Sequence, residues 1–261
     1  MSGRRALWLR LWAVAVFGYL YLPILVLVVF SFNSQKLNLR WQGFTLDWYR
    51  VLLADTRIQE AAINSLVVAG AATTTATVLG TLLALALARY RLAQPAELLL
   101  YIAIIVPEVV LGIALLIWFS QLGIAAGLVT VATGHVVLCT PFVALTVRAR
   151  LSGYDRTLEE AAMDLGAREW TTFWRVTMPA IWPGVLSGAL LAFTLSLDDY
   201  VLALFTAGPG ATTLPLRIFS MVRFSITPEI NALSTLWVVG VSLVLLVAQR
   251  FSRSIGVATK D

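Results

Sequence analysis

Charged side chains are scarce in this chain of 261 residues, of which 13% are Asp, Glu, Lys or Arg and 59% are hydrophobic. A water-soluble domain of this length needs more polar residues to cover its surface, so we expect lipid to solvate the chain. Lysine occurs at Lys36 and Lys260 alone, and the arginines form no dense patch, which argues against nucleic acid as a partner.

Cysteine and histidine each occur once. Cys139 excludes an internal disulfide and a cysteine-rich metal site, and its apolar neighbours predict a buried thiol. His135 has no second histidine with which to bind a metal, so hydrogen-bonded packing or a proton relay are its open roles. A membrane enzyme would need a nucleophile–base pair or a metal cluster. We therefore expect no catalytic and no metal-binding residues.

Long apolar runs are what the chain has instead. A membrane-spanning helix needs ~20 mostly apolar residues. The first run is too long for a signal peptide and no small-residue cleavage site follows it, so we interpret it as a retained span. We predict an all-α integral membrane protein, a single domain over 1–261 with about six transmembrane helices. The predicted spans are 11–31, 61–88, 97–120, 127–147, 181–206 and 231–249.

Arginine and lysine predict the orientation, because they concentrate in cytoplasmic loops. With the N-terminus inside, thirteen of the nineteen basic residues lie on the cytoplasmic side and six lie outside. Both termini and the segment 148–180 are then cytoplasmic. Trp48 falls in the first outer loop, where an aromatic belt or a docking surface would lie.

The cytoplasmic segment 155–179 has the pattern of two short helices. Thr157 is a candidate cap of the first helix, with Glu160 as its capping-box partner. Gly166 suits the left-handed residue that ends this helix, and Pro179 is expected to stop the second. An amphipathic hairpin on the membrane surface also fits this composition. Several large apolar side chains would be exposed unless a partner covers them: Leu158, Leu165, Trp170, Phe173 and Trp174.

The spacing of this segment resembles the EAA motif of ATP-binding-cassette (ABC) importer permeases. Glu160-Ala161-Ala162 is followed after three residues by Gly166, and Val176, Met178 and Pro179 complete the motif. The resemblance implies a type I ABC-importer permease fold, in which this loop is a coupling helix seated in a groove of a cytoplasmic ATPase. The ATPase-coupling residues that it implies are Glu160, Ala161, Ala162, Asp164, Gly166, Glu169 and Pro179.

A phosphate-binding loop is absent from the sequence. Such a loop needs Gly-x-x-x-x-Gly-Lys, and neither lysine follows a glycine. We therefore expect this chain to bind no cofactor and to hydrolyse no ATP. ATP and Mg would be bound by a partner ATPase.

Over essentially its whole length the chain resembles the spermidine/putrescine permeases of the PotC and PotI type. Matching stretches include Ser31-Phe32-Asn33-Ser34, Pro107-Glu108 and Phe193-Thr194-Leu195-Ser196-Leu197-Asp198-Asp199. PotC-type proteins have Pro-Asp where this chain has Pro107-Glu108. The resemblance implies a bacterial inner-membrane location. It also implies a second homologous permease, two ATPase subunits and an extracytoplasmic polyamine-binding protein as partners.

Three carboxylates lie inside predicted spans, where each costs roughly 2.5–3.5 kcal/mol and implies a partner or a water-filled path. Glu108 lies ~16 Å into the third span, near the midplane, and Asp198 and Asp199 lie in the outer half of the fifth. A polyammonium cargo would supply the missing counter-charge. The alternatives are a protonated Glu108 and an aspartate bonded to a helix end or to the partner subunit. The candidate path residues are Glu108, Asp198, Asp199, Ser196, Tyr200 and Trp118.

Two other transporter classes compete with this interpretation. An ion-coupled secondary transporter often has inverted repeats, which are not evident here, and would have no use for a coupling loop. An ABC permease for iron, sulfate or an amino acid would keep that loop. The acidic cluster from Ser196 to Asp199 argues instead for a cation.

Overall fold

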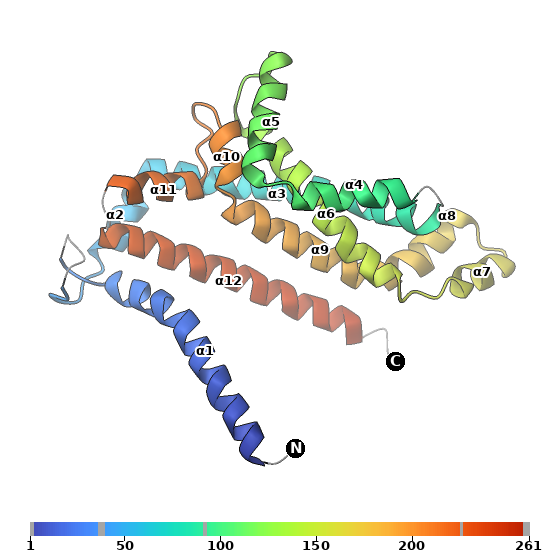
Figure 1. Cartoon of the computed structure of the whole chain (residues 1–261), viewed down its shortest axis with the longest axis horizontal. Coiled ribbons are helices and arrows are strands. Elements are labelled where there is room, and N and C mark those ends of the chain that lie inside the picture. Colours follow the sequence, from blue (N-terminus) through green and yellow to red (C-terminus); the bar gives the residue numbers. More distant parts are fainter. Residues whose placement is uncertain (1–2, 36–39, 91–92, 225–226, 258–261) are drawn as a thin grey trace. The chain divides into compact units, whose positions relative to one another are not determined.

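Helices make up most of the protein in the computed structural model, which describes residues 3–35, 40–90, 93–224 and 227–257 (Figure 1). Within these ranges the one strand-like pairing is an isolated bridge between Asn33 and Phe44. The helices are, in order, α1 (Gly3–Phe30), α2 (Asp47–Ala54), α3 (Thr56–Arg89), α4 (Ala93–Ile105), α5 (Glu108–Gln121), α6 (Leu128–Leu151), α7 (Thr157–Asp164), α8 (Glu169–Thr172), the π-helical turn η1 (Phe173–Thr177), α9 (Met178–Asp198), α10 (Val201–Thr206), α11 (Leu214–Phe224) and α12 (Pro228–Val257).

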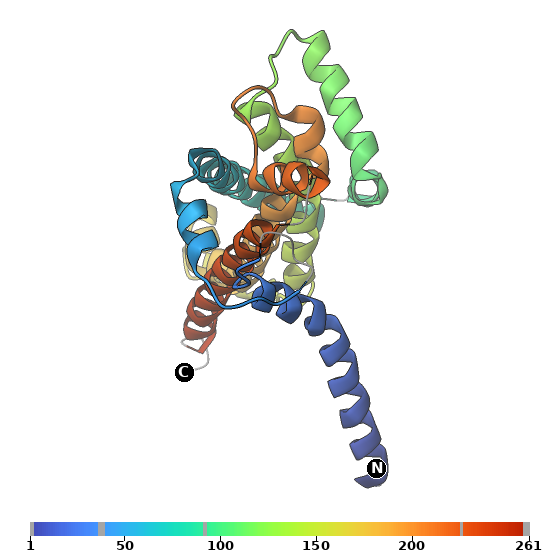
Figure 2. The ribbon, with the colours of Figure 1, turned by 90° about the vertical axis from the view of Figure 1, so that its left-hand side faces the viewer.

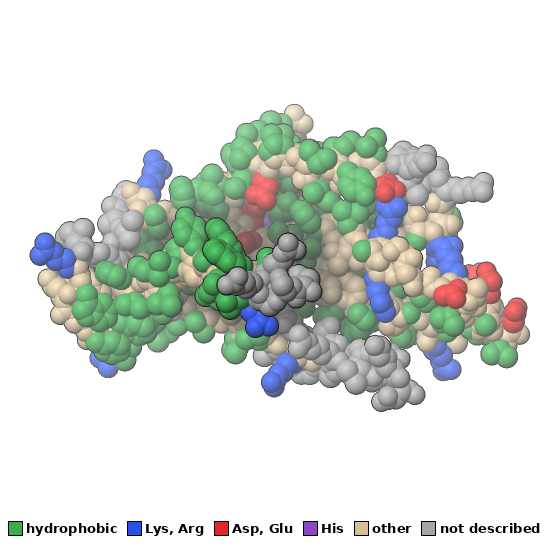
Figure 3. Space-filling model, turned by 60° about the horizontal axis from the view of Figure 1, so that its bottom comes forward, with side chains coloured by type: hydrophobic (Ala, Val, Ile, Leu, Met, Phe, Trp, Pro, Cys, Tyr) green, Lys and Arg blue, Asp and Glu red, His purple; other side chains and the backbone are tan. Residues whose placement is uncertain are grey.

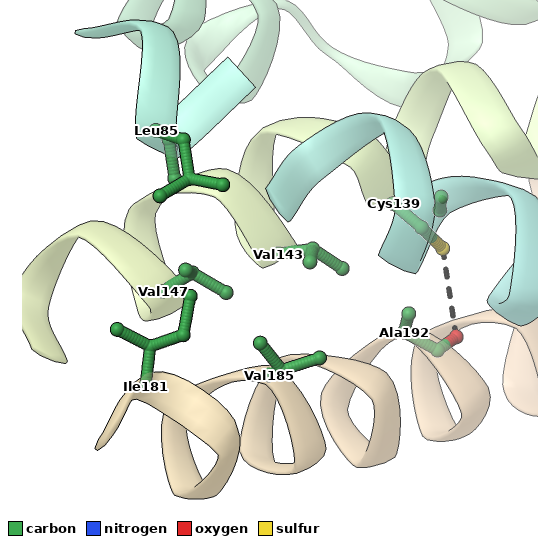
Figure 4. Close-up of a cluster of buried hydrophobic side chains, with 9 residues drawn as sticks. Leu85, Cys139, Val143, Val147, Ile181, Val185 and Ala192 are labelled. Atoms are coloured by element: carbon green, nitrogen blue, oxygen red, sulfur yellow. Dashed lines mark hydrogen bonds between the residues drawn. The ribbon is translucent and has the colours of Figure 1, made fainter. Parts of the chain in front are cut away.

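Two compact units divide the chain. Unit 1 comprises Met1–Gln59 and Ile218–Leu243, and unit 2 comprises Glu60–Arg217 and Val244–Asp261. In unit 2, α6 and α9 lie side by side, and α3 packs against them around a buried apolar cluster (Figure 4). The cluster joins residues far apart in the sequence: Leu85 of α3, Cys139, Val143 and Val147 of α6, and Ile181, Val185 and Ala192 of α9.

Cys139 is fully buried in this cluster, as its apolar neighbours predict. Its thiol donates a hydrogen bond to the carbonyl of Ala192, 3.5 Å away. Small residues allow the helices to approach closely. A Cβ added to Gly184 would lie 2.7 Å from Cβ of Arg150, and one added to Gly188 would lie 3.1 Å from Cγ1 of Val143. The glycine pair of α9 therefore serves packing within this chain.

In unit 1 the segment after α1 forms a small ordered cap. The side chain of Asn33 is fully buried, and its amide donates to the carbonyl of Arg40 while its Oδ1 accepts from the backbone of Gln42. Trp48 is half-buried, and its indole N–H donates to the carbonyl of Asn33 at 2.7 Å. These bonds give the Ser31-Phe32-Asn33-Ser34 stretch a structural role in closing the loop.

Within the described residues, four helical segments are long and apolar enough to cross a membrane: Leu7–Phe30, Thr56–Arg89, Leu128–Leu151 and Glu169–Asp198. The predicted third span is a bent pair, Glu97–Ile105 and Glu108–Gln121, whose axes differ by 102°. The predicted sixth span falls on α12, whose apolar part is Pro228–Val244. The all-α membrane fold is confirmed, but two predicted spans are interrupted. Span 97–120 breaks at Pro107, and span 181–206 breaks after Asp198.

The prediction that Pro179 stops a short helix is wrong. Helix continues from Glu169 through η1 into α9, where Pro179 lies in the first turn. In a regular α-helix the proline ring would clash with the carbonyl four residues earlier. The π-helical turn inserts one extra residue just before this point, which lets the helix continue. The second half of the coupling segment, from Glu169 onward, is thus continuous with the membrane-spanning helix α9.

Candidate functional site

A sharp break between α4 and α5 places Glu108 (Figure 2). Pro107 disfavours helical geometry at the preceding residue and has an extended backbone itself, so α4 ends and α5 begins at Glu108. The expectation that Glu108 lies in the middle of an unbroken span is therefore wrong. Its side chain is exposed at the first residue of α5, where the backbone N–H groups of the helix terminus favour negative charge.

A second break lies between α9 and α10. Helix α9 ends at Asp198, and Asp199 has an extended backbone before α10 begins. Helices α5 and α10 pack tightly, because a Cβ added to Gly112 would lie 2.6 Å from Cδ2 of Phe205. Because α5 begins at Glu108 and α10 follows Asp199, this packing brings the two breaks together. The carboxylate of Glu108 is then close enough to those of Asp198 and Asp199 for their charges to interact.

The two neighbouring aspartates have different environments. Asp199 is 6% exposed, and its Oδ1 accepts hydrogen bonds from the backbone N–H groups of Leu202 and Ala203 at 3.0 and 3.2 Å. It therefore caps α10. Asp198, the last residue of α9, is exposed. The two side chains therefore point in different directions. The carboxylate of Asp199 bonds the start of α10, and that of Asp198 is exposed.

His135 joins Asp199 to the end of α9. This histidine is 1% exposed, and its Nδ1 lies 2.7 Å from the hydroxyl of Ser196, which is also buried. Its Nε2 lies 3.3 Å from Oδ1 of Asp199 without hydrogen-bond geometry. These three residues connect α6, the end of α9 and the start of α10, so they fix the shape of the break that presents Asp198.

The other candidate path residues are less close to the carboxylates. Tyr200 is half-buried within the break itself. Trp118 is 63% exposed, but it lies ten residues beyond Glu108 on α5, ~15 Å along the helix axis. The structure thus brings together Glu108, Asp198, Asp199, Ser196 and Tyr200, and it leaves Trp118 apart. Sequence reasoning gave His135 no partner, because only folding brings α6 against the α9–α10 break.

Asp199→Ala should destabilise the protein, because it leaves the backbone N–H groups of Leu202 and Ala203 without their acceptor and removes the contact with His135. We expect a loss of about 1–3 kcal/mol, measured as a lower thermal midpoint and a lower yield of folded protein. Asp199→Asn keeps the capping oxygen and should be much milder. A matched change at exposed Asp198, Asp198→Ala, should leave stability near wild type. Equal destabilisation by both alanine variants would contradict this division of roles.

The helix that carries the EAA residues ends as the sequence predicts. Gly166 has φ +88°, in the left-handed region. Its N–H bonds to the carbonyl of Met163 at 2.9 Å, and the N–H of Ala167 bonds to the carbonyl of Ala162 at 3.1 Å. This pair of bonds is the Schellman motif, which turns the chain sharply after α7.

The start of α7 differs from the prediction. Thr157 is the first residue of the helix and not its cap, since Oδ1 of Asp155 accepts the Thr157 N–H at 3.0 Å. Hydrogen bonds from the backbone and side chain of Thr157 hold the pKa of Asp155 below its usual range. Asp155 takes the capping role because an aspartate carboxylate can fold back onto the backbone N–H two residues later.

The coupling segment is a charged projection with a large apolar component. In Figure 3, acidic and basic side chains gather over the end of unit 2 that carries α7. Leu165 and Trp170 are 90% and 72% exposed, whereas Phe173 is half-buried and stacks on Trp170. Among the predicted coupling residues Ala162 is half-buried, and the exposed ones are Glu160, Ala161, Asp164, Gly166, Glu169 and Pro179.

Sequence reasoning missed Glu159, which precedes the EAA residues. Its carboxylate binds Arg89 at the end of α3 and accepts a 2.5 Å hydrogen bond from Thr177 of η1. The sequence held a partial signal that Glu159 faces the rest of the protein, because it lies four residues before the apolar Met163 and so on the same face of α7. What the sequence lacked was the partner, because Arg89 is 70 residues away.

No group of three or more His, Cys, Asp or Glu side chains with the placement of a metal site occurs in the part of the chain that the structure describes.

Comparison with known proteins adds a family and a set of relatives. Residues 76–256 match the family described as "Binding-protein-dependent transport system inner membrane component". The spermidine/putrescine transport system permease protein PotC of Escherichia coli (strain K12) is 42% identical over 238 residues, covering 90% of each chain. The putrescine transport system permease protein PotI of the same strain is 44% identical over 241 residues, covering 89% of this chain and 86% of PotI.

Solved structures of ABC importers share the fold. A bacterial ABC transporter involved in the import of the acidic polysaccharide alginate matches with a TM-score of 0.74 at 17% identity, over 96% of this chain and 98% of that chain. The MetNI methionine ABC transporter in an inward-facing conformation matches with a TM-score of 0.64 at 18% identity, over 81% and 99%. The predicted importer-permease fold is thereby confirmed.

Proposed function

The chain belongs to the family of binding-protein-dependent transport system inner membrane components, and we propose that it is the permease subunit of an ATP-driven importer of polyamines such as spermidine and putrescine. The observation that carries the proposal is the 42–44% identity, over about nine-tenths of the chain, to permeases of that cargo. The acidic residues at the meeting point of α5, α9 and α10 support it independently, because they suit a polycation.

In this proposal Glu108 and Asp198 are the counter-charges of the cargo. Both carboxylates are exposed in the described part of the chain, and each lies where a helix is interrupted, so neither is enclosed by its own bundle. An ammonium group that leaves water needs such a partner in a region of low dielectric constant. Tyr200 adds an aromatic face at the same break. Asp199 and Ser196 act through position, by holding the break with His135.

The remaining parts of the transporter follow from the family pattern. We assign a second homologous permease to complete the path, two ATPase subunits that bind ATP and Mg, and an extracytoplasmic polyamine-binding protein that delivers cargo. The EAA residues of α7 face the ATPase. Both termini lie in the cytoplasm, and the cap that contains Trp48 faces the binding protein on the opposite side.

Isolation of the intact assembly tests this proposal. We expect a tagged chain, purified in mild detergent, to bring a second permease and an ATPase with it, and the assembly to hydrolyse ATP. The same chain stripped of its ATPase should hydrolyse none, because it lacks a phosphate-binding loop. ATP hydrolysis by the stripped chain would overturn the assignment.

A further inference from the structure

Helix α7 has no buried side chain of its own, although in the proposed function it is the element that contacts the ATPase. An eight-residue helix of this kind is not held by an apolar core, and its intrinsic helical stability is marginal. Polar contacts must therefore attach it to the membrane helices. Glu159, which is half-buried on the inner face of α7, makes the contacts that do so.

The carboxylate of Glu159 binds two elements at once. Nη2 of Arg89, at the C-terminal end of α3, donates to both carboxylate oxygens at 3.0 and 3.2 Å. The hydroxyl of Thr177, which is 1% exposed, donates to Oε1 at 2.5 Å. Charge-assisted hydrogen bonds of this kind are shorter and stronger than neutral ones. One side chain thus joins α7 to α3 and to the π-helical turn that leads into α9.

Two further features surround this attachment, a second hydrogen bond to α3 and a cavity beside Glu159. The guanidinium group of Arg156, just before α7, donates to the carbonyl of Ala88 in the last turn of α3. Behind Glu159 lies a polar cavity of about 230 Å³ that Thr172 also lines. The Thr172 residue is 4% exposed, and its hydroxyl has no protein partner among the described residues. The cavity leaves the carboxylate room to exchange partners when α7 moves.

We propose that Glu159, with Arg89 and Thr177, is the mechanical link that transmits movement of α7 to α3 and α9. This inference rests on the proposed function, since it presumes an ATPase that moves α7. Glu159 is a positioning residue here, because it touches neither ATP nor cargo. Its loss should uncouple hydrolysis from transport and leave both partners bound.

The test is the number of cargo molecules imported per ATP hydrolysed, measured with the intact assembly in proteoliposomes. Glu159→Gln keeps the shape of the side chain and removes its charge, and Arg89→Gln removes the charge of its partner. We expect both to lower the ratio of cargo to ATP by at least fivefold with normal assembly. Glu60→Gln, an exposed carboxylate at the opposite end of α3, is the matched control and should keep the wild-type ratio.

Two further variants separate transmission from folding. Thr177→Val replaces a hydroxyl by a methyl group of equal size, so it should lower the ratio without loss of assembly. Charge exchange, Glu159→Arg with Arg89→Glu, should recover part of the ratio. A wild-type ratio in Glu159→Gln and Thr177→Val would overturn the proposal. Loss of assembly in every variant would make the link merely structural and overturn it too. If the wild-type assembly itself imports no polyamine, the proposed function fails, and that result is distinct from these.

Discussion

Glu108→Gln and Asp198→Asn should each slow polyamine uptake by about 30–150-fold per assembled complex. Each variant keeps the size and hydrogen-bonding capacity of the side chain and removes one counter-charge of an ammonium group. A hydrogen bond to a charged partner contributes about 1.5–3 kcal/mol, and a loss of about 2–3 kcal/mol in the transport barrier corresponds to that range of rates. Labelled polyamine uptake into vesicles, normalised to intact transporter, measures it.

The pattern among variants is as informative as the size of the effect. Asp199→Asn should reduce uptake per complex far less than Asp198→Asn, because Asp199 caps α10 and does not face outward. Glu60→Gln should have no effect, since this exposed carboxylate lies near the start of α3, a helix that contains neither break. Near-normal uptake per complex in both Glu108→Gln and Asp198→Asn would remove these residues from the path and leave the family assignment intact.

Gly166→Val should abolish most of the stimulation of ATP hydrolysis by loaded binding protein, with an expected decrease of at least about tenfold. The left-handed backbone at Gly166 costs a non-glycine residue roughly 1–2 kcal/mol, and a β-branched residue more. The Schellman turn would then open and redirect α7. Because α7 contributes no buried side chain, the membrane part should still fold. Stimulated hydrolysis by the purified assembly measures the effect.

Two control variants make this prediction specific. Gly166→Asn should fall between wild type and valine, since asparagine tolerates the left-handed region better than other side chains. Gly153→Val changes a glycine of the preceding loop that has open space and no positive φ, so it should behave like wild type. Full stimulation in Gly166→Val would show that the turn after α7 is not needed for coupling.

Periodicity and motif spacing predict the helical spans, the family and the left-handed turn at Gly166, because each of these depends on local sequence. The break at Pro107 was readable from the proline, yet the apolar run on both sides favoured an unbroken helix. The break after Asp198 has no local breaker. It depends on Asp199, which leaves the helical conformation, caps α10 and contacts His135.

The coupling segment shows the same limit. The EAA pattern selects Glu160, which is exposed, whereas the contacts with α3 and η1 belong to Glu159. The pattern of one helix cannot say which of two adjacent carboxylates meets an arginine 70 residues away. Pro179 likewise signals a helix end in a regular geometry, and the π-helical turn that accommodates it follows from tertiary packing.

Uptake by the purified assembly in proteoliposomes tests the central claim most directly. With polyamine-loaded binding protein outside and ATP and Mg inside, we predict accumulation of labelled spermidine or putrescine against its gradient. We predict no accumulation without ATP when a proton or sodium gradient is imposed, and little competition from anionic or neutral solutes. Accumulation driven by an ion gradient in the absence of ATP would contradict the account.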